Sequence, residues 1–150
     1  MKVRPAALII RHHNGHPEIL LMHYRYGDAD VFALPGGNPD RGETLPETVM
    51  REVQEELGIS IMVGDMILAG EMLLSERADD VLHVVFVALN VQGEPVLNPA
   101  ETSALAVEWM SIADLDKRNL YPNVGKTIQQ WFDSITDLGY VGRIEQPYFG

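Results

Sequence analysis

The chain contains no cysteine among its 150 residues. Disulfides, thiolate metal ligands and a cysteine nucleophile are therefore excluded, and any metal must be held by oxygen or imidazole ligands. No apolar run reaches the roughly 18 residues of a membrane-spanning helix, and the first residues lack the apolar stretch and cleavage site of a secretion signal. These absences predict a cytoplasmic protein without a membrane association.

Basic residues are also scarce. The chain has 11 Lys and Arg and 22 Asp and Glu, which give a formal net charge of −11. A surface of this charge repels nucleic-acid backbones, which are bound through clustered Lys and Arg. A nucleic-acid polymer is therefore disfavoured as a partner. A small phosphate compound remains compatible with the charge if a divalent cation lies between protein carboxylates and substrate oxygens.

The length predicts one domain over residues 1–150, and the hydrophobic content of 46% is enough for a buried core. Apolar and β-branched runs, separated by turn residues, predict strands at residues 3–11, 18–24, 31–34, 59–63, 66–74, 81–89 and 104–109. Apolar spacing predicts a late helix at residues 124–137. Residues 140–150 carry no assignable pattern. Mostly strands thus surround two helices.

The best-marked element is an early helix over residues 45–57. Thr44 and Glu47 have the spacing of a capping box at its start. Gly58 stands where a helix ends in a left-handed residue. The helix boundaries are therefore predicted more firmly than any others in the chain.

One face of this helix gathers Glu52, Glu55 and Glu56. Like charges at such spacing destabilise a helix by about 0.2–0.5 kcal/mol per pair, so something should compensate them. A solvated acidic face beside Arg51 is the ordinary interpretation. The alternative is a site for a hard cation held by oxygen, Mg²⁺ or Mn²⁺.

The wider pattern around this helix favours the metal site. Residues 37–59 match G-x5-E-x7-R-E-U-x-E-E-x-G-U, with U an aliphatic residue, at every fixed position. This segment resembles the signature of the Nudix hydrolases. The resemblance implies an α/β (α+β) fold in which a mixed β-sheet lies between α-helices. It also implies hydrolysis of a nucleoside diphosphate linked to another group.

The resemblance further implies a role for each polar position of the segment. Glu52, Glu55 and Glu56 match metal ligands, and Glu52 also matches a group that accepts a proton from the attacking water. Arg51 and Glu43 match residues that orient those carboxylates. The implied cofactor is Mg²⁺ or Mn²⁺, whose charge would offset that of the diphosphate.

A fourth carboxylate often joins this set from a loop outside the segment. Glu101 is the first candidate, because it lies in the loop before the strand that contains Trp109. Glu71 and Glu76 are the next candidates. An ordinary role for Glu101 as a loop residue stays open.

Three residues are weaker candidates for binding the substrate. Tyr24 and Arg25 could stack on a base and contact phosphate, although packing and solvated charge are commoner roles for such residues. Asn123 is a candidate for reading the base, but a helix N-cap is the stronger interpretation. Five histidines lack the spacing of a metal site and are predicted to be turn or surface residues rather than ligands: His12, His13, His16, His23 and His83.

The substrate is less defined than the chemistry. In the family that the chain resembles, a downstream proline marks members acting on ADP-ribose and a tyrosine those acting on dinucleoside polyphosphates. Residues 60–81 contain neither. A nucleoside triphosphate or a nucleotide sugar remains, and a homodimer is compatible. A catalytically silent Nudix module that binds a nucleotide for regulation is the alternative, although such modules usually lose carboxylates that this chain retains.

Overall fold

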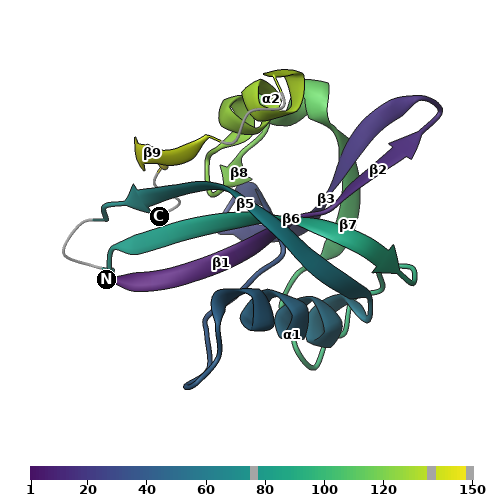
Figure 1. The fold of residues 1–150 in the computed structure, drawn as a ribbon, viewed down its shortest axis with the longest axis horizontal. Helices are drawn as coiled ribbons and strands as arrows, with labels where there is room; N and C mark the ends of the chain where they lie inside the picture. The colour runs from purple at the N-terminus through teal and green to yellow at the C-terminus, as the bar shows by residue number, and fades with distance from the viewer. Residues whose placement is uncertain (75–77, 135–137, 148–150) are drawn as a thin grey trace.

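The computed structural model describes residues 1–74, 78–134 and 138–147, which form two β-sheets with a helix on either side (Figure 1). The first sheet has the order β1-β6-β5-β9, built from Lys2–Leu8, Val81–Gln92, Ser60–Met72 and Gly139–Arg143. The second has the order β2-β3-β4-β8, with β7 also paired to β3. Its strands are Ile10–His13, His16–Tyr26, Ala29–Ala33, Leu120–Tyr121 and Ala106–Ser111. Both sheets mix parallel and antiparallel pairs, which confirms the predicted α+β class.

The two helices cover opposite faces of this β-structure, as Figure 1 shows. Ala7 of β1 packs in the cluster that contains Val49 of α1 (Leu45–Leu57), whereas Leu8 packs in the cluster that contains Ile128 of α2 (Gly125–Ser134). Successive residues of a strand point to opposite faces, so β1 must be apolar on both. This explains the apolar run from Pro5 to Leu8 within it.

Helix α1 begins and ends where the sequence predicts. The Thr44 hydroxyl accepts from the Glu47 N–H, and the Glu47 carboxylate accepts from the Thr44 N–H. Such a cap stabilises a helix by about 1 kcal/mol. Gly58 closes the helix at φ 67°, which a glycine adopts without strain. The helix is thus fixed at both ends of the acidic face.

Two strand predictions were wrong in detail. The predicted strand 3–11 divides at Ile9, because the chain passes there from β1 in the first sheet to β2 in the second. The predicted strands 59–63 and 66–74 are one strand, β5, in which Gly64 and Asp65 fall within an irregular register rather than a turn. Gly64 and Asp65 indicate from the local sequence that the strand is irregular there. They do not indicate that β5 continues to pair with β6 on both sides of the irregularity.

The last part of the chain contains elements that the sequence did not predict. A 3₁₀ helix, η1 (Ile112–Lys117), follows β7, and Gly139–Arg143, mostly within the segment without an assignable pattern, form β9 beside β5. The predicted end of the late helix, residues 135–137, lies outside the described residues. Within the described part of the chain, no helix has both the length and the apolar character needed to cross a membrane.

Candidate active site

Arg51 on α1 holds three of the acidic side chains together. Its Nε and Nη2 donate to the two carboxylate oxygens of Glu43 at 2.7 and 3.0 Å. Its Nη1 donates at 3.2 Å to both Glu52 and Glu55, and Nη2 also donates to the Asn38 carbonyl. The structure therefore brings together Arg51, Glu43, Glu52 and Glu55.

Glu43 is held as an anion in this network. The hydrogen bond from Arg51, together with those from the Asp40 N–H and the Thr48 hydroxyl, lowers the pKa of Glu43 to about 2. The hydrogen bond with Glu43 in turn raises the pKa of the Arg51 guanidinium above its ordinary value. Glu43 therefore stays charged at any working pH and keeps Arg51 oriented towards the carboxylates of α1.

Glu56 completes the acidic face. Burial, with the charge of Glu52 and a hydrogen bond with it acting in the same direction, raises the pKa of Glu56 to about 8. Two neighbouring carboxyl groups in a partly buried place cannot both ionise cheaply without a cation. The crowded oxygens therefore fit a hard divalent ion, which prefers carboxylate ligands.

The carboxylates are not arranged as a closed cage. Within residues 1–74, 78–134 and 138–147, no three acidic or histidine side chains form a group that could hold a metal as placed. Glu52 and Glu55 turn towards Arg51 instead. Binding an ion through Glu52, Glu55 and Glu56 would require these side chains to rotate on a fixed helix.

Gly37, the first residue of the signature, lies directly against this cluster. A Cβ atom at Gly37 would come within 2.4 Å of the Glu52 carboxyl carbon. The Gly37 N–H donates to the Pro5 carbonyl at 3.2 Å, which joins the loop to β1. A larger residue at this position would displace the Glu52 carboxylate, which gives the glycine its physical reason.

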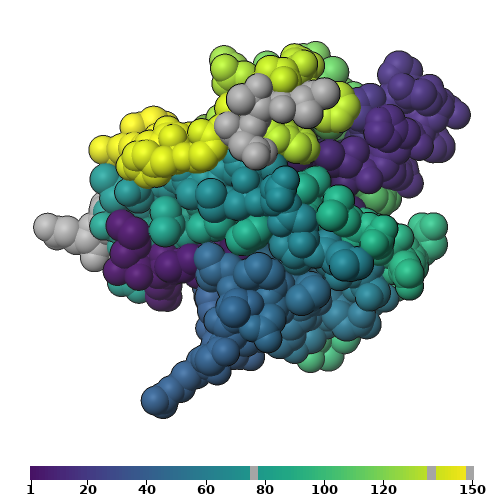
Figure 2. Space-filling model, in the orientation of Figure 1, coloured from purple at the N-terminus to yellow at the C-terminus, as the bar shows by residue number. Residues whose placement is uncertain are grey.

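A pocket of about 760 Å³ adjoins Gly37. Tyr24, Tyr26 and Tyr121 give it three aromatic side chains and Arg4 a guanidinium, while most of the other lining residues are aliphatic. Figure 2 shows the surface hollowed between the N-terminal end of the chain and the projecting loop before α1. A concave aromatic site beside clustered carboxylates suits a nucleotide.

The three residues suggested for substrate binding lie in different settings. Tyr24 lines the pocket, and its hydroxyl is 3.1 Å from that of Thr102. Arg25 is exposed and pairs with Asp30 at 3.2 Å, and it is not among the lining residues. The side chain of Asn123 donates to the Glu145 carbonyl at 2.8 Å and so holds the C-terminal segment.

Glu101 lies in a loop that binds the C-terminal turn of α1. The Asn98 N–H donates to the Glu56 carbonyl at 2.9 Å, and the Glu101 N–H donates to the Asn98 carbonyl at 2.9 Å. The loop therefore passes close to Glu56, with the Glu101 side chain exposed. Of the other candidates, Glu71 accepts from the Tyr140 hydroxyl, and Glu76 lies outside the described residues.

Comparison with known proteins agrees with this geometry. The profile of the NUDIX domain matches residues 2–132. The chain belongs to the Nudix family. A nudix hydrolase of Caenorhabditis elegans is 30% identical over 111 residues, which is 73% of this chain but only 29% of that protein. The chain thus spans less than a third of this relative.

Two solved structures show how widely this Nudix fold is shared. The MutT protein of Methanosarcina mazei is 29% identical, with a TM-score of 0.69 over 88% of this chain and 92% of that one. The MutT protein of Bacillus halodurans is 20% identical, with a TM-score of 0.74 over 100% of this chain and 94% of that one. The second likeness concerns the fold alone.

Two lining residues of the pocket in this Nudix chain were not predicted from the sequence. Arg4 and Tyr121 were not singled out, although an arginine inside an otherwise apolar strand could have drawn attention. The prediction that His83 is a turn or surface residue was wrong, because His83 on β6 is fully buried. Burial, with a smaller contribution from the charge of Arg4, lowers the pKa of His83 to about 3. The ring is therefore neutral.

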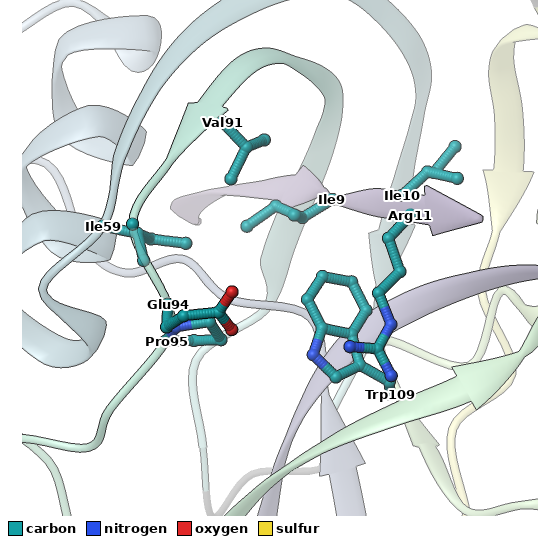
Figure 3. Close-up of a pocket in the computed structure, with 9 residues that line it drawn as sticks. Ile9, Ile10, Arg11, Ile59, Val91, Glu94, Pro95 and Trp109 are labelled. Atoms are coloured by element: carbon teal, nitrogen blue, oxygen red, sulfur yellow. The ribbon is translucent and has the colours of Figure 1, made fainter. Parts of the chain in front are cut away.

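A second, smaller cavity of about 290 Å³ lies away from the carboxylates (Figure 3). Trp109 of β7 and Arg11 of β2 form one side, and Glu94 and Pro95 lie opposite. The Arg11 guanidinium lies 4.3 Å from the centre of the Trp109 ring and donates to Glu18 at 2.9 Å. None of the signature's acidic residues lines this cavity.

Proposed function

We propose that this Nudix chain is a metal-dependent hydrolase that cleaves the diphosphate linkage of a nucleoside diphosphate joined to another group. The substrate class is a nucleoside triphosphate or a nucleotide sugar. One observation carries the proposal: Gly37 both lines the aromatic pocket and lies against Glu52. A nucleoside held in the pocket would therefore present its phosphates to the carboxylates of α1.

The residues fit a role for Mg²⁺ or Mn²⁺ at Glu52, Glu55 and Glu56. When bound, such an ion supplies charge neutralisation for the diphosphate and a lower pKa for coordinated water. The chain's own residues orient the reaction. Arg51 and Glu43 hold Glu52 and Glu55 in place, and Glu52 accepts the proton of the attacking water.

The reaction breaks one P–O–P bond and adds the elements of water across it. A nucleoside triphosphate gives a nucleoside monophosphate and pyrophosphate, and a nucleotide sugar gives a nucleoside monophosphate and a sugar phosphate. The pocket suits the nucleoside, because Tyr24 and Tyr26 stack at 6.1 Å between ring centres and offer an aromatic wall to a base.

A substrate panel with product identification tests this proposal. Nucleoside triphosphates, nucleotide sugars, ADP-ribose and dinucleoside polyphosphates would be incubated with the chain and Mg²⁺, and products followed by phosphorus NMR. We expect a nucleoside monophosphate from at least one member of the first two classes. Nucleotide binding without turnover of any compound would instead favour the silent regulatory module.

A further inference from the structure

Arg4 occupies an unusual position for a charged residue. It stands in β1 between apolar neighbours, is half-buried, and pairs in register with the buried His83 of β6. Its guanidinium lies 5.3 Å from the centre of the Tyr121 ring. A charge in such a place is retained only where something compensates its loss of hydration.

The described part of the chain compensates Arg4 poorly. Its Nη2 donates to the Leu34 carbonyl at 3.1 Å, while Nη1 is buried and has no hydrogen-bond partner. A buried donor without an acceptor is destabilising, and a charged one more so. Arg51 is the opposite case, because each of its guanidinium nitrogens has an acceptor. Arg4 therefore retains unused donors for an anion.

Arg4 lines the aromatic pocket, and the strand that carries it is hydrogen-bonded to the loop beside the carboxylates. The Ala7 N–H donates to the Pro35 carbonyl at 2.8 Å, and the Gly37 N–H donates to the Pro5 carbonyl at 3.2 Å. This part of β1 is thus fastened to the segment that ends against Glu52. A phosphate that joins a nucleoside in the pocket to the reacting linkage would pass this point.

The other charges of the pocket do not duplicate Arg4. Among the described lining residues only Lys2, Arg4 and Asp79 are charged, and Lys2 pairs with Asp79 at 3.4 Å. Lys2 is also exposed to solvent, which weakens its field. Arg4 is therefore the cation of this pocket for which the described residues supply no ion pair.

We propose that Arg4 binds a phosphate oxygen of the substrate at the junction of the pocket and the carboxylate cluster, and so selects for the diphosphate. The guanidinium keeps its bond to Leu34 with one nitrogen and turns another towards the ligand. The guanidinium lies over the ring of Tyr121, and this contact supports the orientation. The inference rests on the proposed function for the identity of the substrate, but phosphate binding itself can be measured without turnover.

Calorimetric binding of methylenediphosphonate in the presence of Mg²⁺ tests the proposal, because this probe has a diphosphate-like group and neither a base nor a cleavable linkage. Arg4→Gln keeps a donor for Leu34 and removes the charge, and we expect it to weaken binding about 10-fold or more. Arg4→Lys should restore part of the loss. Lys2→Gln is the matched control from the same strand and pocket, and should change affinity less than about twofold.

Kinetics on a substrate from the panel provide the second measurement. A phosphate contact made in both the ground state and the transition state raises KM in Arg4→Gln more than it lowers kcat. Thermal unfolding checks whether Arg4→Gln and Arg4→Lys are folded. If Arg4→Gln does not fold, Arg4→Lys is decisive, because an altered affinity for the probe supports the contact and an unaltered KM and affinity contradict it.

The outcomes also separate this inference from the proposed function. Arg4-dependent binding of the probe by a chain that hydrolyses no panel compound would support the contact and reject the hydrolase. Turnover with unchanged KM and probe affinity in Arg4→Gln would reject the contact alone. Failure of the wild-type chain to bind the probe, or an equal loss in Lys2→Gln, would also overturn it.

Discussion

Arg4 and Arg11 lie close together in sequence and face two different cavities. Arg11 beside the smaller cavity is satisfied by Glu18 and by the ring of Trp109. Arg4 beside the larger pocket has a buried nitrogen without a partner, and so does its neighbour His83. The contrast indicates that Arg11 stabilises the fold and that Arg4 is available to bind a ligand.

The same contrast extends to the acids near each cavity. Glu52 is held by Arg51 and crowded by Glu56, whereas Glu94 at the smaller cavity is exposed and has no recorded ion pair within the described residues. Chemistry is therefore expected on one side of the molecule. The predictions below test that division, beginning with the largest effect.

Glu52→Gln preserves shape and removes both charge and basicity. We expect kcat to fall by about 10² or more while the unfolding free energy changes little, because the side chain is needed for metal and proton rather than for packing. Steady-state kinetics with saturating Mg²⁺ measures this. Glu94→Gln is the matched control, and an unchanged kcat in Glu52→Gln would move the role elsewhere.

His83 should make the stability of the protein fall in mild acid. Its pKa is about 3 in the folded chain against an ordinary 6.5, so the unfolded chain takes up a proton below pH 6.5 while the folded chain does not. Stability is therefore complete above pH 6.5 and declines as the pH falls towards 3. The loss should reach about 2 kcal/mol at pH 5.

Urea unfolding at pH 7 and pH 5 checks this value. His83→Leu should remove most of that difference, because the leucine cannot titrate. His13→Gln is the control, since His13 is exposed. Equal pH dependence in the wild type and His83→Leu would show that the buried ring does not control the acid limit.

Glu101→Gln should lower kcat or weaken metal affinity by about 10-fold if the loop carboxylate reaches the cluster, as expected for a residue that supports a metal site. Metal titration of activity measures both quantities. Glu108→Gln on β7 is a control for the loss of one charge. Wild-type behaviour of Glu101→Gln, with impairment of Glu71→Gln or Glu76→Gln, would assign the fourth carboxylate to the earlier segment.

Arg11→Met should have the smallest effect of these substitutions, and the effect should be on stability rather than on catalysis. We expect the unfolding free energy to fall by about 1 kcal/mol, since an ion pair and a cation–π contact are lost at a partly exposed place. Urea unfolding measures the change, and KM should stay the same. A raised KM would show that the smaller cavity takes part in substrate binding and would remove the contrast with Arg4.

The division between the cavities also shows what the sequence could predict. The bounds of α1 agree with prediction because Thr44, Glu47 and Gly58 act through local hydrogen bonds and backbone conformation. The family followed from the match of residues 37–59 to the Nudix signature, and the α+β class was what that resemblance implies. These features depend on near neighbours in the chain.

The rest of the pocket depends on long-range pairing. Arg4 comes beside His83 only because β1 pairs with β6, and Tyr121 reaches the pocket through the short pairing of β8 with β4. Nothing local distinguishes a histidine on a strand with both faces buried from one on an exposed strand. The sequence therefore could not show which side chains would surround the substrate.

Removal and return of the metal test the central claim most directly. The wild-type chain would be freed of divalent ions with EDTA, verified by metal analysis, and assayed on the best substrate of the panel before and after addition of Mg²⁺ or Mn²⁺. The account predicts no measurable turnover without metal and full recovery on its return, with Glu52→Gln inactive in both conditions. Undiminished turnover by the verified metal-free protein would contradict it.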